Sequence, residues 1–110
     1  MRILVVDSVY KLMDRYENEL KGLYEDLREL SNNRKYNFLE AEAILTADSF
    51  LDFIIERLSG FILRPDTPKD LEKKAEDLLH LAYEIRDFIY DNFQDVYRER
   101  HKYTFQAEAG

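Results

Sequence analysis

The sequence predicts an all-α protein, an antiparallel bundle of three helices with a long third helix. Apolar residues recur at spacings of three and four in three separate segments, the period of an α-helix with one buried stripe. The chain has only three glycines and two prolines to make turns, which favours helices over a sheet. The segments are joined by short loops, and such loops place successive helices antiparallel. A chain of 110 residues suffices for one domain, which we expect over residues 1–103.

The first predicted helix covers residues 6–31. Its apolar seam alternates spacings of three and four without a break, as in a coiled coil. Leu23 lies in the middle of this seam, so we expect its side chain to be buried. The sequence leaves open whether residues 1–6 form the first turn of the helix or an extended segment. The seam contains Val6, Val9, Met13, Tyr16, Leu20, Leu23, Leu27 and Leu30.

The second predicted helix covers residues 37–60. Asn37 is a favourable N-cap, and Glu40 is placed three residues later to complete a capping box. Either Gly60 ends the helix, or the helix continues to Leu63 before Arg64-Pro65. Its main seam contains Ile44, Ala47, Leu51, Ile54, Leu58 and Phe61, and further apolar residues widen the arc well beyond one stripe: Phe50, Phe53, Ile55 and Ile62.

The third predicted helix covers residues 68–101 and has a length of about 50 Å. Thr67 is its expected cap, Pro68 suits the first turn, and Asp70 is placed to reach back to the cap. Because the other two helices are shorter, the last turns should overhang them. Residues 104–110 lack a cap and a helical period, and we expect a frayed tail. The seam contains Leu71, Ala75, Leu78, Ala82, Ile85, Ile89, Phe93 and Val96.

A second stripe on the third helix carries tyrosines seven residues apart, with arginines interleaved. Tyrosine and arginine are enriched where protein interfaces concentrate their binding energy. The stripe therefore predicts a non-enzymatic interaction or scaffold protein, and we expect a homodimer formed through it, or else another protein partner. The alternative is that a neighbouring helix of the same chain covers the stripe. The predicted interface residues are Tyr83, Arg86, Tyr90, Phe93, Tyr97 and Arg100.

Acidic residues on the third helix offer a second hypothesis. Asp77, His80 and Glu84 have a spacing that can present metal ligands, but their face points away from the apolar seam. Glu84 and Asp87 form an E-x-x-D pair, and Glu40 and Glu42 add carboxylates on the second helix. The run Glu76-Asp77-Leu78-Leu79 resembles the third helix of MazG-type pyrophosphohydrolases. That resemblance implies magnesium-dependent nucleotide hydrolysis. The residues themselves predict no catalytic residue, metal site or cofactor, because the acids do not converge.

The segment from Tyr97 to Tyr103 mixes cations with aromatic residues. It resembles the end of HEPN-type helical domains, whose ribonuclease motif places an arginine several residues before a histidine. Only two residues separate Arg98 from His101, so the resemblance implies a HEPN-like domain that lacks the catalytic motif. Cations at this position also offset the helix dipole.

The charge and composition of the chain indicate which classes of partner we expect it to bind. The formal charge of −7 makes nucleic acid an unlikely ligand, because backbone binding depends on lysine and arginine. No apolar run approaches the ~20 residues that a membrane span requires, so we expect no membrane partner. The absence of cysteine fits a cytoplasmic protein. The abundance of Glu, Lys, Arg and Tyr is compatible with a thermophilic source.

Overall fold

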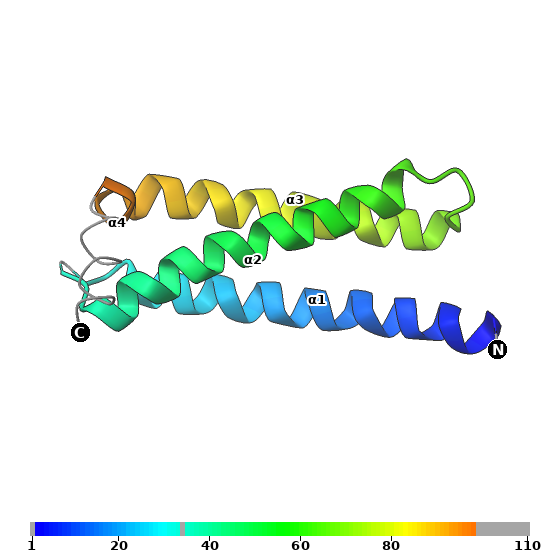
Figure 1. Cartoon of the computed structure of the whole chain (residues 1–110), viewed down its shortest axis with the longest axis horizontal. Coiled ribbons are helices and arrows are strands. Elements are labelled where there is room, and N and C mark those ends of the chain that lie inside the picture. Colours follow the sequence, from blue (N-terminus) through cyan, green and yellow to red (C-terminus); the bar gives the residue numbers. More distant parts are fainter. Residues whose placement is uncertain (1, 34, 99–110) are drawn as a thin grey trace, which may run out of the picture.

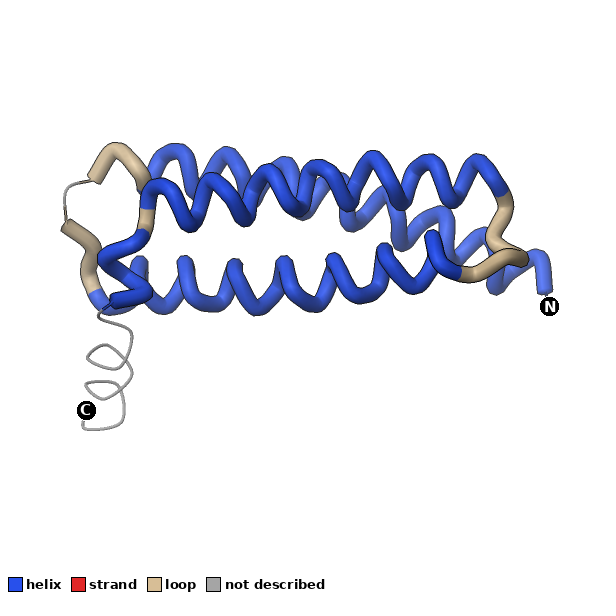
Figure 2. Tube along the Cα trace, turned by 90° about the horizontal axis from the view of Figure 1, so that it is seen from above, coloured by secondary structure: helices blue, strands red, loops and turns tan. Residues whose placement is uncertain are grey.

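The computed structural model describes residues 2–33 and 35–98, with side chains described from residue 7 onward. Four helices follow one another along the chain: α1 (Arg2–Leu30), α2 (Phe38–Leu63), α3 (Lys69–Asn92) and α4 (Gln94–Arg98). The three long helices lie side by side, with the α1–α2 loop at one end of the molecule and the α2–α3 loop at the other (Figures 1 and 2). The predicted all-helical bundle is confirmed for this part of the chain.

The helices share one apolar core. α2 packs most extensively on α3, and α1 packs on α3 more than on α2. Within the described residues no helix combines the length and apolar composition needed to cross a membrane. Every described member of the predicted α3 seam is buried, as are five of the six predicted α2 seam residues. The buried residues are Met13, Tyr16, Leu20, Leu27, Ala41, Ile44, Ala47, Leu51, Ile54, Leu58, Leu71, Ala75, Leu78, Ala82, Ile85, Ile89, Phe93 and Val96.

Leu23, which we expected to be buried, packs against the core but is only partly buried. On α1, residues seven apart contact α3: Tyr10 reaches Asp70, Glu17 accepts from Lys74, and Tyr24 stacks edge-on against Phe88. Leu23 lies on the other flank of the core stripe and therefore faces the side of α2. The α1–α2 pair is the least closely packed pair of long helices, which leaves the Leu23 side chain partly open to solvent.

The structure shows the two helix boundaries that the sequence left open, the start of α1 and the end of α2. α1 begins at Arg2, so residues 2–6 belong to the helix, while Met1 lies outside the described residues. At the start of α2, Glu40 N–H donates to Asn37 Oδ1 at 2.8 Å, and Asn37 N–H donates to Glu40 Oε1 at 3.1 Å. This is the predicted capping box. α2 continues through Gly60 to Leu63 and ends where Arg64 takes an extended conformation.

The predicted cap of α3 is wrong. α3 begins at Lys69, Pro68 occupies the cap position, and no side chain satisfies the first amide groups. Asp70 does not reach back toward Thr67, because its carboxylate accepts a hydrogen bond from the Tyr10 hydroxyl at 2.9 Å. The residue expected to complete a local cap instead joins the start of α3 to α1.

The single helix predicted over residues 68–101 is also wrong. α3 ends at Asn92, where the side-chain amide donates to the Phe88 carbonyl at 2.9 Å. Phe93 leaves the helical conformation at φ −127° and ψ 32°, and the chain turns into α4. The turn places Phe93 and Val96 in the core, with the Phe93 ring 5.5 Å from the Tyr36 ring. The apolar overhang is thereby removed, since a straight continuation would expose these side chains. The remainder of the predicted helix and the tail lie outside the described residues.

Candidate functional site: the tyrosine surface of α3 and α4

An aromatic surface forms where α3 meets α4. Tyr83 and Tyr90 are among the most exposed large apolar residues described, at 45% and 46%. The rings of Tyr90 and Tyr97 lie 5.5 Å apart, centroid to centroid. Tyr90 and Tyr97 line an open hollow of about 420 Å³ together with Gln94 and Arg98. We call Tyr83, Tyr90, Tyr97, Gln94 and Arg98 the tyrosine surface.

Arg86 belongs to the predicted stripe but does not present a free guanidinium. It pairs with Asp52, and its Nε lies 4.0 Å from Asp48 Oδ1. The side chains of Arg86 and Asp48 are each only 20% exposed. The interleaved arginine therefore joins α3 to α2 within the molecule. Its burial does not require an external partner, because the guanidinium already lies beside two carboxylates of α2.

A buried polar cluster adjoins the tyrosine surface. Asp48 Oδ1, Arg86 Nε and the Tyr97 hydroxyl are buried, and none of these atoms makes a hydrogen bond of good geometry. Burial and the neighbouring Asp48 carboxylate nevertheless raise the pKa of the Tyr97 hydroxyl above its ordinary value. Tyr97 therefore keeps its proton to a higher pH than an ordinary tyrosine does.

This pKa shift predicts a loss of stability in alkali. The folded-state pKa of Tyr97 lies above the unfolded value of about 10, so its contribution to stability is present below pH 10 and is lost as the pH rises further. We expect Tyr97→Phe to lose less stability than the wild type between about pH 8 and about pH 11. Urea denaturation at the two pH values measures this difference. Parallel losses in both proteins would contradict the assignment.

Phe93 and Arg100, two further predicted interface residues, are not part of the tyrosine surface as the structure describes it. Phe93 is fully buried among Phe88 and Tyr36, so it belongs to the core and is not available on the surface, contrary to the prediction. Arg100 lies outside the described residues. Of the predicted stripe, Tyr83, Tyr90 and the exposed edge of Tyr97 remain open to solvent, and α4 adds Gln94 and Arg98.

The acids of the second hypothesis are not brought together. Glu40 is committed to the α2 capping box and also accepts from Asn33. Asp77 pairs with Lys73 at 3.5 Å, while Glu84 and Asp87 are exposed on α3. In the described part of the chain, no three histidine or acidic side chains are grouped to hold a metal ion. The spacing of these residues along α3 therefore does not correspond to a shared metal site among the described residues.

The basic segment at the end of the chain is only partly described. Arg98 is exposed and pairs with Asp95 one turn earlier, at 3.1 Å. His101, the second residue of the HEPN-type comparison, lies outside the described residues. The described geometry of this segment is an exposed ion pair at a helix end.

The sequence interpretation missed Asp48 and Asp52. They are the only charged residues in the apolar segment 43–55 and lie four residues apart, hence on one face of α2. Two acids in an otherwise uncharged segment indicate a cationic neighbour, and Arg86 is that neighbour. Gln94 was also missed, because its place on the surface depends on the turn at Phe93.

Comparisons with protein-family models, with curated proteins and with solved structures found no match. The candidate site is therefore argued from the residues of this chain alone.

Proposed function

We propose that this chain is a non-enzymatic interaction protein, an antiparallel three-helix bundle that binds a partner protein through the tyrosine surface. The observation that carries the proposal is the exposure of Tyr83 and Tyr90, at 45% and 46%, on a regular helix. A tyrosine on a helix loses little conformational entropy on binding and offers both an apolar ring and a hydroxyl. The adjoining hollow gives a partner side chain a place to insert.

The charge around the surface favours a basic partner. Asp87 is exposed and lies four residues after Tyr83 and three before Tyr90, so it shares their face. Asp52 borders the same face through its pair with Arg86, and its side chain is 65% exposed. Arg86 and Arg98 are already paired with aspartates. A two-fold contact between copies here would oppose acid to acid, so the surface suits a basic partner better than a second copy.

The experiment uses a synthetic amphipathic helix of leucine and lysine as the probe. Tyr90→Glu is compared with Asn18→Glu, which adds the same charge at an exposed position of α1, away from the tyrosine surface. We expect Tyr90→Glu to weaken binding by at least about ten-fold, because an interface tyrosine is lost. Asn18→Glu should bind within about two-fold of the wild type, since it leaves the surface intact.

The two variants have equal net charge. A difference in peptide affinity between them therefore reports the loss of the Tyr90 ring and not the added charge. If both bind the peptide as tightly as the wild type, attraction to a basic peptide depends on charge alone and the proposed surface is wrong. Circular dichroism of each variant establishes that the helices are intact before affinities are compared.

A further inference from the structure

α2 carries apolar residues beyond its core face. One face fills the core, and a second seam with the alternating spacing of a coiled coil runs along its flank, where Phe50 still packs against the core. On this second face Leu39 is 74% exposed and Phe53 is 51% exposed. Exposed apolar residues beside the core face mark a surface that another element can cover. We call the second seam the outer face of α2; it comprises Leu39, Ala43, Thr46, Phe50, Phe53, Arg57, Gly60 and Arg64.

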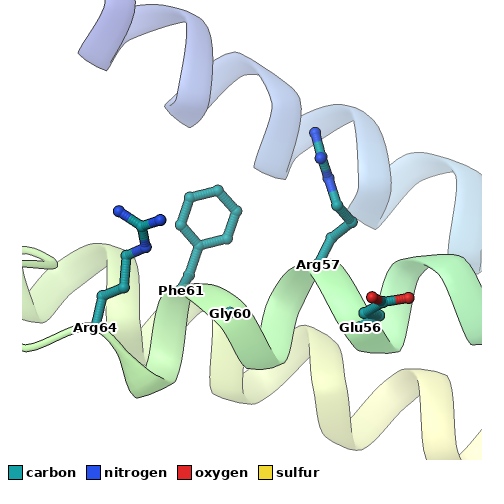
Figure 3. Close-up of a pocket in the computed structure, with 5 residues that line it drawn as sticks. All are labelled: Glu56, Arg57, Gly60, Phe61 and Arg64. Atoms are coloured by element: carbon teal, nitrogen blue, oxygen red, sulfur yellow. The ribbon is translucent and has the colours of Figure 1, made fainter.

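The C-terminal half of the outer face is hollowed. Glu56, Arg57, Gly60, Phe61 and Arg64 line an open hollow of about 340 Å³. Figure 3 shows Arg57, Phe61 and Arg64 pointing to the side of α2 on which α1 lies. A side chain at Gly60 would meet no atom within 4 Å, so the floor of the hollow is open to an incoming residue. The N-terminal half carries the complementary feature, the protruding Leu39.

The charges of α2 are ordered along its length. Its acidic residues all precede its arginine Arg57, and Arg64 follows directly after the helix. Among the described residues, no ion pair involves Glu42, Arg57 or Arg64. The Arg57 guanidinium lies over the Phe53 ring at 5.5 Å, on the outer face itself. The two arginines are thus available at the hollowed end of this face, beside Glu56, and Glu42 borders its other end.

We propose that the outer face of α2 binds the same face of a second copy of this chain, with the two α2 helices antiparallel. A two-fold axis near Phe50 and Phe53 brings these rings of the two copies together. The N-terminal half of each copy, with Leu39 and Glu42, then lies against the hollow and arginines of the other. A parallel pairing would oppose Glu42 to Glu42 and Arg57 to Arg57, which disfavours it.

This contact is independent of the tyrosine surface, which lies on α3 and α4. It closes on itself, so it forms a dimer and not an open chain of molecules. It also covers the side of the bundle where α1 and α2 pack least closely. The two copies together bury the exposed aromatic and aliphatic side chains that a single copy leaves in water.

The first test is the solution mass by light scattering. The wild type is expected at twice 13.2 kDa. Phe53→Glu should give monomers, because it places a carboxylate at the two-fold contact. Tyr83→Glu is the matched control, since Tyr83 is 45% exposed and Phe53 51%, and it should remain dimeric. A wild type that remains at 13.2 kDa when concentrated would overturn the proposal. So would dissociation by Tyr83→Glu equal to that by Phe53→Glu.

Charge exchange tests the direction of pairing without removing an apolar contact. Glu42→Arg and Arg57→Glu should each raise the dimer dissociation constant by about ten-fold or more, because like charges then face each other. Mixing the two variants should restore an affinity within a few-fold of the wild type, since every facing pair in the mixed dimer is again of opposite sign. A mixture that dimerises no better than its components would contradict antiparallel pairing of α2.

Discussion

Leu20→Ala is expected to lower the free energy of unfolding by about 2–5 kcal/mol, the cost of a cavity in a closely packed core. The Leu20 side chain is 0% exposed and lies in the α1 stripe that faces both α2 and α3. The loss is a large fraction of the total stability of a domain of this size. Urea denaturation followed by circular dichroism measures it.

Two further leucine-to-alanine variants serve as controls, because their leucines are less buried than Leu20. Leu23→Ala changes the same residue type on the same helix, but Leu23 is partly exposed, so the expected loss is only about 1 kcal/mol. Leu63→Ala changes a leucine that is 81% exposed and should stay within about 0.5 kcal/mol of the wild type. Equal losses for Leu20→Ala and Leu23→Ala would contradict the loose packing of α1 against α2.

Arg86→Leu is expected to lower the free energy of unfolding by about 1–3 kcal/mol, because it leaves a largely buried carboxylate without its cation. Arg86 is the cation that joins Asp48 and Asp52 of α2 to α3. Asp48 is only 20% exposed, so water replaces the guanidinium poorly. Asp48→Asn added to Arg86→Leu should recover much of the loss, since the uncompensated charge is then gone.

Arg98→Leu provides the matched control. The pair of Arg98 and Asp95 has the same chemistry, but its side chains are 73% and 81% exposed. Exposed ion pairs contribute little to stability, and we expect a change within about 0.5 kcal/mol. An Arg86→Leu variant as stable as Arg98→Leu would mean that Arg86 is not a structural cation. Arg86 would then again be a candidate interface residue.

The core was predictable because it depends on one-dimensional periodicity. A buried stripe on a helix follows from a spacing of three and four, whatever the neighbouring helices are. Leu51, Ile54 and Leu58 on α2, and Ala82, Ile85 and Ile89 on α3, are buried as their spacing predicts. The capping box of Asn37 and Glu40 was predictable for the same reason, since both partners lie within one turn.

The remaining features depend on contacts between segments far apart in the sequence. Asp70 was expected to serve its own helix, but it accepts from Tyr10, sixty residues earlier. The end of α3 at Asn92 has no glycine or proline to mark it. It occurs where the chain turns and buries Phe93 and Val96. Arg86 likewise appears free on a helical wheel until α2 supplies its aspartates.

The measurement that tests the proposed function most directly is an amide NMR titration with the leucine–lysine peptide. We expect the first and largest shifts around Tyr83, Tyr90 and Gln94, with the outer face of α2 unaffected. That result would place the peptide on the tyrosine surface, with its acidic border in α2 and α3. Largest shifts on the outer face of α2, or shifts spread evenly over all exposed acids, would contradict binding through the tyrosine surface.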